Sequence, residues 1–312
     1  EDVSDSPFRA LCKENGADVM YTEFILREGL IRDAVTSVQK LDIFEYERTI
    51  VIQIFGYEIE SMREAAAITE EANPDIIDIN YGCPVKKVAC KGAGAGILQD
   101  IPKMVRMTAE IVKAVNKPVT VKTRLGWDEN SKYIVDVAER LQDVGIKAIS
   151  IHGRTRKQMY KGEADWSLIR DVKENTRMNI PVFGNGDVDT PEKAKLMKDT
   201  YGIDGIMIGR ASIGNPWVFN EIKHYLNTGE KLAPASMPQR IEAARRHLEM
   251  AIEWKGEKLG IFETRRHYAN YFKGFPHFKE IRMALVTLET QEELFGLLNK
   301  VKLDYSEREL VQ

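Results

Sequence analysis

Two of the three cysteines in the 312-residue sequence lie in the stretch "DINYGCPVKKVACKGAGAGIL", residues 78–98. Cys83 and Cys90 are too far apart for C-x-x-C redox chemistry, and no second cysteine pair or neighbouring histidine completes a zinc site. The run "GAGAG" lacks the G-K-[ST] ending of a P-loop, so it is either a flexible active-site loop or a tight packing turn. A thiol is mostly protonated at neutral pH, and Cys83 could therefore serve as a proton donor.

Polar and charged residues also recur at the ends of six predicted β-strands. A single residue of this kind carries little information, but six strands in succession favour a shared site, because active sites of parallel barrels lie at the carboxyl ends of their strands. In chain order the residues are Gln53, Asn80 with Cys83, Lys122 with Arg124, His152 with Arg154, Asn185 with Asp187, and Gly209 with Arg210.

Lys122 is a cation that the strand pattern points inward. Alternation within "VTVKTRL" puts Thr120, Lys122 and Arg124 on one face, and the valines on the face that meets the helices. A lysine inside a barrel is costly unless an anion meets it, so its partner is either a structural carboxylate or a ligand. We favour the ligand.

The last two strands end in "GNGD" (184–187) and "MIGR" (207–210). Glycines allow backbone N–H groups to approach phosphate oxygens, and Arg210 can hold them through two hydrogen bonds. The alternative is that Gly184, Gly186 and Gly209 only form turns. Because the loops after the last two strands of a barrel commonly bind phosphate, the two motifs together predict a phosphate-bearing cofactor or substrate.

Apolar strand patterns alternate with helical patterns through the first two-thirds of the chain, which predicts a parallel sheet covered by helices. We predict a (β/α)8 TIM barrel whose first strand is missing from the sequence, because "SPFRALCKENG" is typical of a helix that follows a strand. An open doubly wound sheet is the alternative, although no G-x-G-x-x-G follows any strand. The seven predicted strands are 18–25, 49–56, 75–82, 118–126, 148–154, 181–187 and 205–210, and the clearest helices between them are 58–73, 101–116, 132–144 and 191–201.

The stretch "NTGEKLAPASMP" (227–238) has the composition of a linker, so we predict a catalytic barrel domain at 1–228 and an α-helical bundle domain at 239–312. Residues 236–282 carry ten Lys/Arg against six Asp/Glu, although the whole chain has a net charge of −3. This segment is either a basic face for a polyanion, with Arg265, Arg266 and Lys273 as contacts, or a solvated helix face. Its aromatic residues follow helical spacing and are predicted to face a core: Tyr268, Tyr271, Phe272 and Phe275.

Composition excludes several classes of protein. The hydrophobic content of 43% and charged content of 30% are typical of a soluble globular protein. No apolar run approaches the ~18 residues of a membrane span, and the acidic first residues are not a signal peptide. Three cysteines without disulfide-framework spacing suit a reducing cytoplasm, where we expect a monomer without a metal ion or a membrane contact. Cys12 is predicted to be a core residue, and Cys90 to pack within its loop.

In chain order, "DINYGCP" with its glycine loop, "VKTRLGW", "IHGRTR", "FGNGD" and "MIGRASIGNPW" resemble the tRNA-dihydrouridine synthases, and most of all their bacterial B-type branch. The resemblance runs from "SPFRALCKENGADVMYTEFI" to "RRHYANYFKGFPHFKEIR", hence over nearly the whole chain. It implies a flavin-binding barrel, a helical tRNA-binding domain, and FMN that is reduced by NADPH. The Pro-Met pair that ends the family's first strand is absent from this sequence, which would affect barrel closure and FMN affinity.

The resemblance also assigns roles to residues. It implies hydride transfer from reduced flavin N5 to C6 of a uracil base, with Cys83 giving a proton to C5. Gln53 and Lys122 would contact the flavin ring, and Asn80 would lie beside the base. Arg124 and Arg154 would meet tRNA phosphates or the target base, which must be flipped out of the folded tRNA. The ribityl chain and phosphate would be held by His152, Asn185, Gly186, Asp187, Gly209 and Arg210.

Two other functions remain open. One is an FMN barrel oxidoreductase that acts on a free metabolite, such as a dihydroorotate dehydrogenase, and the basic helical segment disfavours it. The other is a tRNA-binding protein without catalytic activity, which the presence of Cys83, Lys122 and Arg210 disfavours.

Overall fold

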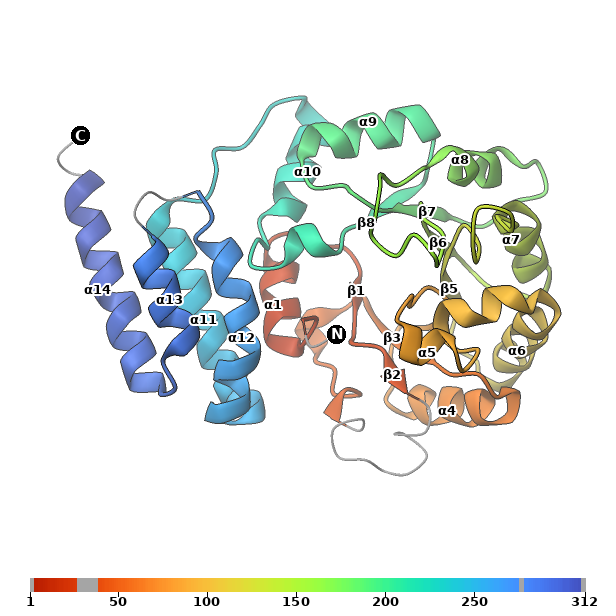
Figure 1. The fold of residues 1–312 in the computed structure, drawn as a ribbon, viewed down its shortest axis with the longest axis horizontal. Coiled ribbons are helices and arrows are strands. Elements are labelled where there is room, and N and C mark those ends of the chain that lie inside the picture. The colour runs from red at the N-terminus through yellow and green to blue at the C-terminus, as the bar shows by residue number, and fades with distance from the viewer. Residues whose placement is uncertain (1–2, 27–38, 275–277, 310–312) are drawn as a thin grey trace. The chain divides into compact units, whose positions relative to one another are not determined.

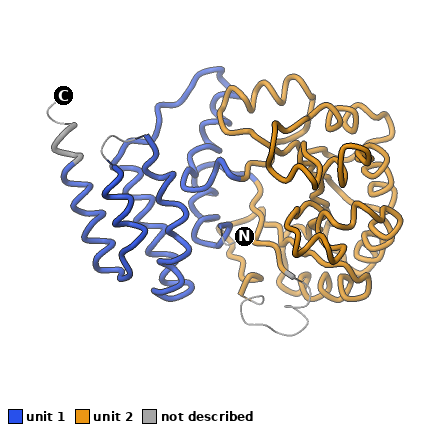
Figure 2. The backbone as a smooth tube through the Cα atoms, viewed as in Figure 1, with its two compact units in different colours: residues 1–18, 210–312 blue, residues 19–209 orange. Residues whose placement is uncertain are grey.

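A computed structural model describes residues 3–26, 39–274 and 278–309. The chain divides into two compact units, which Figure 2 colours separately: residues 19–209, and residues 1–18 together with 210–312. The second unit thus begins earlier than the predicted linker, and it includes α1 (Ser6–Glu14) from the start of the chain. The reason lies in its contacts, since Glu14 pairs with Arg246 and Asp5 with Lys255.

Residues 19–209 form a curled, wholly parallel sheet with helices on its outside (Figure 1). The predicted strand 18–25 consists of two short segments that both pair with the next strand. Among the described residues no strand pairs with both β8 and β1, so the sheet is curled like a barrel but not closed. The additional strand that would close it, predicted to precede residue 1, stays a prediction. The strands are β1 (Met20–Tyr21), β2 (Ile25–Leu26), β3 (Ile50–Phe55), β4 (Ile76–Asn80), β5 (Val119–Arg124), β6 (Ile149–His152), β7 (Val182–Asn185) and β8 (Gly205–Met207).

The predicted helices between the strands are confirmed. The side chain of Thr190 accepts a hydrogen bond from the Lys193 backbone N–H, so it caps the N-terminus of α9. The helices α5 and α8 are not among the four clearest predicted helices; only Ile169 and Val172 are buried along the eight residues of α8, which is too short a pattern to identify. The helices are α4 (Ile59–Glu71), α5 (Lys86–Ala89), α6 (Ile101–Ala114), α7 (Ile134–Asp143), α8 (Ser167–Glu174) and α9 (Pro191–Tyr201), with 3-10 turns η1 (Glu45–Glu47) and η2 (Gly94–Gln99).

The other unit is helical throughout its described residues. As expected, Tyr268, Tyr271 and Phe272 are buried in its core, together with Leu248 and Leu285, whereas Phe275 lies outside the described residues. No helix among the described residues is long and apolar enough to cross a membrane. Besides α1 the elements are η3 (Arg210–Ser212), α10 (Val218–Thr228), α11 (Met237–Lys255), α12 (Glu257–Tyr271), α13 (Lys279–Thr287) and α14 (Gln291–Glu309).

Candidate active site

The register of the parallel sheet brings the predicted site residues next to one another at the carboxyl ends of its strands. Gln53 lies opposite Asp78, and Asn80 lies opposite Lys122. Arg124 is opposite His152 on the following strand. His152 in turn is opposite Asn185, and Asn185 opposite Met207. The prediction that successive strand ends contribute to one edge of the sheet is therefore confirmed for the residues of this unit.

A chain of buried side-chain hydrogen bonds runs from Asp78 to the turn that holds Cys83. Gln53 Nε2 donates to Asp78 Oδ2 at 2.7 Å, and Asn80 Nδ2 donates to Gln53 Oε1 at 2.7 Å. The remaining amide oxygen, Asn80 Oδ1, accepts the backbone N–H groups of Gly82 at 2.9 Å and Cys83 at 3.0 Å. An ionised carboxylate, at one end of this series of hydrogen bonds, only accepts, and a backbone N–H, at the other end, only donates. Both ends therefore require the same orientation of the Gln53 and Asn80 side-chain amides.

Asp78 and Thr120 belong to this network, but they were not among the predicted site residues. Thr120 Oγ1 donates to Asp78 Oδ1 at 2.6 Å, and Asp78 is fully buried. Burial raises the pKa of Asp78 to about 6, while hydrogen bonds from Thr120 and Gln53 and the charge of Lys122 oppose the rise. The alternation of "DIIDIN" offered a signal, since Asp78 and Asn80 share a face of the strand.

Cys83 is nearly buried, with 8% of its surface exposed, at the first turn after β4. Its carbonyl oxygen accepts the backbone N–H of Ala95 at 3.0 Å, so the glycine run folds back over it. A Cβ on Gly94 would lie 2.9 Å from the Cβ of Cys83, and a Cβ on Gly96 would lie 2.2 Å from the carbonyl oxygen of Ala89. Of the two alternatives for this run, the structure therefore shows the tight packing turn.

Replacement of Gly94 by alanine is expected to destabilise the fold more than replacement of Gly92. Both glycines have positive φ, at +52° and +76°, but a Cβ on Gly92 would meet nothing within 4 Å. Gly92→Ala thus reports the backbone strain alone, and Gly94→Ala adds overpacking against Cys83, which costs about 1–3 kcal/mol more in free energy of unfolding. Urea unfolding of the two variants measures the difference; equal losses would show that the Cys83 turn yields freely.

Two titratable side chains at the strand ends, Lys122 and His152, have lowered pKa values. Burial lowers the pKa of Lys122 to about 8, and the charge of Arg124 lowers it further, while Asp78 and Cys83 act in the opposite direction. Burial likewise lowers the pKa of His152 to about 2, with Arg124 as the next cause. His152 is therefore neutral at physiological pH. Its Nε2 lies 3.2 Å from Arg154 Nη1, and since a guanidinium only donates, the ring proton belongs on Nδ1.

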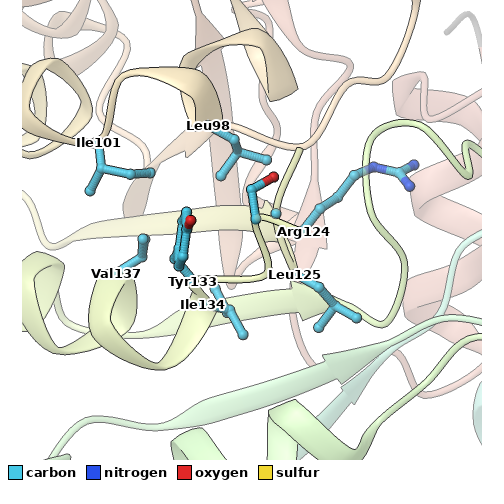
Figure 3. A pocket seen from close by; sticks show the side chains of 9 residues that line it. Leu98, Ile101, Arg124, Leu125, Tyr133, Ile134 and Val137 are labelled. Carbon is cyan, nitrogen blue, oxygen red and sulfur yellow. The ribbon is translucent and has the colours of Figure 1, made fainter. Parts of the chain in front are cut away.

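Arg124 and Arg154 are both buried and bound to the protein itself. Arg124 donates to the carbonyl oxygens of Gly82, Thr155 and Met159. Figure 3 shows its guanidinium directed away from the apolar side chains of a seam between α6 and α7 that has no room for a water-sized molecule. Arg154, 2% exposed, donates to Asp187 Oδ2 at 2.5 Å and to the carbonyl oxygen of Gly162. Their contact with tRNA stays a prediction, whereas their bonds to the loops around the site are observed.

The glycines of the predicted phosphate loops differ in how closely other residues pack against them. A Cβ on Gly184 would lie 2.0 Å from the Trp166 ring, and a Cβ on Gly186, which has φ +124°, would lie 2.7 Å from Ala164. By contrast, a Cβ on Gly209 would meet nothing within 4 Å. Asn185 Nδ2 donates to the Met207 carbonyl oxygen, which joins the ends of the two strands from which these loops begin. Arg210, the next residue after Gly209, belongs to the helical unit, and its phosphate contact stays a prediction.

The predicted polyanion contacts of the helical unit have mixed surroundings. Arg265 Nη2 donates to the carbonyl oxygen of Leu288, and Arg265 lines a cavity of about 780 Å³ beside α12. Arg266 is partly exposed and Lys273 is exposed. Within the residues described, no group of three or more His, Cys, Asp or Glu side chains could hold a metal ion.

Comparison with known proteins finds sequence similarity to one family over nearly the whole chain. The family model described as "Dihydrouridine synthase (Dus)" matches residues 1–308. The tRNA-dihydrouridine synthase B of Shewanella oneidensis is 38% identical over 310 residues, which cover 99% of this chain and 94% of that protein. A probable tRNA-dihydrouridine synthase of Rickettsia conorii is 37% identical over 284 residues, covering 91% of this chain and 85% of that protein.

Solved structures resemble the chain in fold. Histamine dehydrogenase from Rhizobium sp. 4-9 superposes with a TM-score of 0.56 at 12% identity. The likeness covers 80% of this chain but 47% of that one, so the present chain spans about half the length of this neighbour. A 2-naphthoyl-CoA reductase superposes with a TM-score of 0.55, also at 12% identity, over 72% of this chain and 47% of that one. Identities this low support the barrel-like arrangement alone.

Proposed function

Because the chain belongs to the dihydrouridine synthase family, we propose that it reduces specific uridines of tRNA to 5,6-dihydrouridine, with FMN as cofactor and NADPH as reductant. The observation that carries the proposal is the pairing of a thiol with a cation. Cys83 lies in the first turn after β4, and Lys122 lies opposite Asn80 on β5, with its Nζ 3.6 Å from the position of a Cβ on Gly82. A proton donor and a positive charge thus belong to neighbouring strands at the same edge of the sheet.

The residues present fit a flavin mononucleotide. Lys122 is partly exposed, and its side-chain ammonium makes no hydrogen bond or ion pair with another residue of the described ranges, so its charge is available to a ligand. The space beside Gly209 is open, as a phosphate contact requires. When bound, FMN reduced by NADPH would supply a hydride from N5 to C6 of the uracil. Lys122 and Gln53 would hold the ring, and Lys122 would stabilise its negative charge after reduction.

Cys83 completes the reduction by giving its thiol proton to C5 of the uracil, and the resulting thiolate takes up a proton from solvent before the next turnover. Asn80 orients this step, since its side chain holds the backbone of the Cys83 turn, and it would lie beside the base. His152, Asn185, Gly186, Asp187, Gly209 and Arg210 would hold the ribityl chain and phosphate. Arg124 and Arg154 brace the surrounding loops, and Arg265, Arg266 and Lys273 of the helical unit would contact the tRNA backbone.

The full chain should therefore purify as a yellow protein that releases FMN on denaturation. Incubation with NADPH and tRNA lacking dihydrouridine should add two hydrogens to defined uridines, measured by mass spectrometry of nuclease digests. Free uridine serves as the control substrate and should stay unchanged. Unmodified tRNA after complete flavin reduction would contradict the proposal, and turnover of free uridine would favour a metabolite reductase.

A further inference from the structure

The segment that follows Cys83 is exposed and strongly basic. Lys86 and Lys87 lie on the short helix α5, Lys91 follows two residues after it, and all three side chains are exposed. No acidic residue occurs from Cys83 to Gln99, although the whole chain carries a net charge of −3. In the part of the chain that the structure describes, none of the three amines has an ion-pair or hydrogen-bond partner.

These lysines are held in a fixed position relative to the thiol. The backbone N–H of Cys90 donates to the carbonyl oxygen of Lys86 at 2.9 Å, which closes the turn of α5. The close approach of Gly96 to Ala89 and the hydrogen bond from Ala95 to Cys83 attach this turn to the base of the site. Lys86 is three residues from Cys83, so their Cα atoms are at most about 11 Å apart. A nucleotide that reached the thiol would carry its own phosphates into the range of these side chains.

Such a set of free ammonium groups beside a catalytic thiol suits a polyanion better than a neutral or small substrate. The guanidinium groups of Arg124 and Arg154 are less available for this contact, because both residues are buried and their N–H groups donate to protein carbonyl and carboxylate oxygens. Resting on the proposed function, we infer that Lys86, Lys87 and Lys91 form an RNA-binding edge of the active site, which contacts the backbone phosphates on either side of the target uridine.

A matched pair of triple variants of the full, FMN-bound chain tests this inference. The first replaces Lys86, Lys87 and Lys91 with Gln. The control replaces Lys113, Lys147 and Lys198 with Gln, which removes the same charge from exposed positions in the segments that lead into the amino ends of the strands. Filter binding of tRNA lacking dihydrouridine, at a series of KCl concentrations, gives the dissociation constant and its salt dependence for each protein.

The variant with Lys86, Lys87 and Lys91 replaced by Gln (the loop variant) is expected to bind tRNA at least about tenfold more weakly than wild type. The magnitude of the slope of log affinity against log salt concentration should fall by about two to three, because each lost phosphate contact means that one counterion fewer is released on binding. The control should stay within about threefold of wild type. Flavin reduction by NADPH without tRNA should be the same in all three proteins. Replacement of the three loop lysines with Arg should preserve both affinity and slope, which separates lost charge from a damaged fold.

An unchanged salt slope in the loop variant, or an equal loss in the control or the Arg variant, would overturn the inference. Neither result would touch the proposed function, which depends on whether the wild-type enzyme forms dihydrouridine. Conversely, the wild-type protein could bind tRNA through this loop without reducing it. That result would support the RNA-binding role of the three lysines and would contradict the proposed reaction.

Discussion

Replacement of Cys83 by Ala is expected to lower the rate of dihydrouridine formation by about 10²–10⁴-fold, the range that general acid catalysis supplies. The thiol is the only acidic group in the turn that Asn80 and Gly94 hold at the end of β4. Without it the proton for C5 of the uracil must come from water, which the nearly buried position of the side chain restricts. FMN content and tRNA affinity should stay at the wild-type level, because neither depends on the proton.

Single-turnover experiments with pre-reduced enzyme measure this loss directly, because they leave out the step in which NADPH reduces the cofactor. Cys90→Ala is the matched control, since Cys90 is a free cysteine seven residues along the same loop, with its side chain exposed. Wild-type turnover in Cys83→Ala would remove Cys83 from the acid role. A comparable loss in Cys90→Ala would mean that the loop, and not the position of one thiol, determines the rate.

Alternation along single strands was sufficient to predict which side chains share a face of the sheet. Lys122 was predicted to face inward because Val119 and Val121 occupy the other face, and its register opposite Asn80 agrees with this. Cys12 was predicted to be a core residue and is buried. The first prediction depends on strand parity and the second on the apolar character of a lone cysteine, and both are local properties that a short stretch of sequence contains.

Predictions that depended on contacts between distant segments were beyond the reach of single motifs. Arg154 stands near the carboxyl end of a strand, as Lys122 does, but its guanidinium is bound by the carbonyl oxygens of residues 161 and 162 and by Asp187 from the next strand end. The glycines of "GAGAG" and "GNGD" look alike in sequence. Only the fold shows that Gly94 and Gly186 are packed against other residues while Gly209 borders open space.

Removal of the charge of Lys122 is expected to produce the second large effect. Lys122→Met keeps the length of the side chain but removes the cation that would stabilise the reduced flavin, and loss of one such preorganised group lowers turnover by about 10²–10³-fold. FMN should also bind the apoprotein more weakly. Lys147→Met, at an exposed position before β6, is the control and should change neither quantity. If Lys122→Met kept the FMN affinity and turnover of the wild type, Lys122 would not be part of the flavin site.

The lowered pKa of Lys122 adds a pH dependence whose direction follows from the structure. Since the pKa is about 8, Lys122 in the apoprotein carries its charge below that pH and loses it as the pH rises, so FMN affinity should fall through about pH 8. Asp78 is ionised in this range and raises the pKa of Lys122, so Asp78→Asn should move the fall to lower pH. Lys122→Met should abolish it. Fluorescence titration of FMN across pH 6–10 measures all three proteins; a fall at the same pH in wild type and Asp78→Asn would show that Asp78 does not sustain the charge of Lys122.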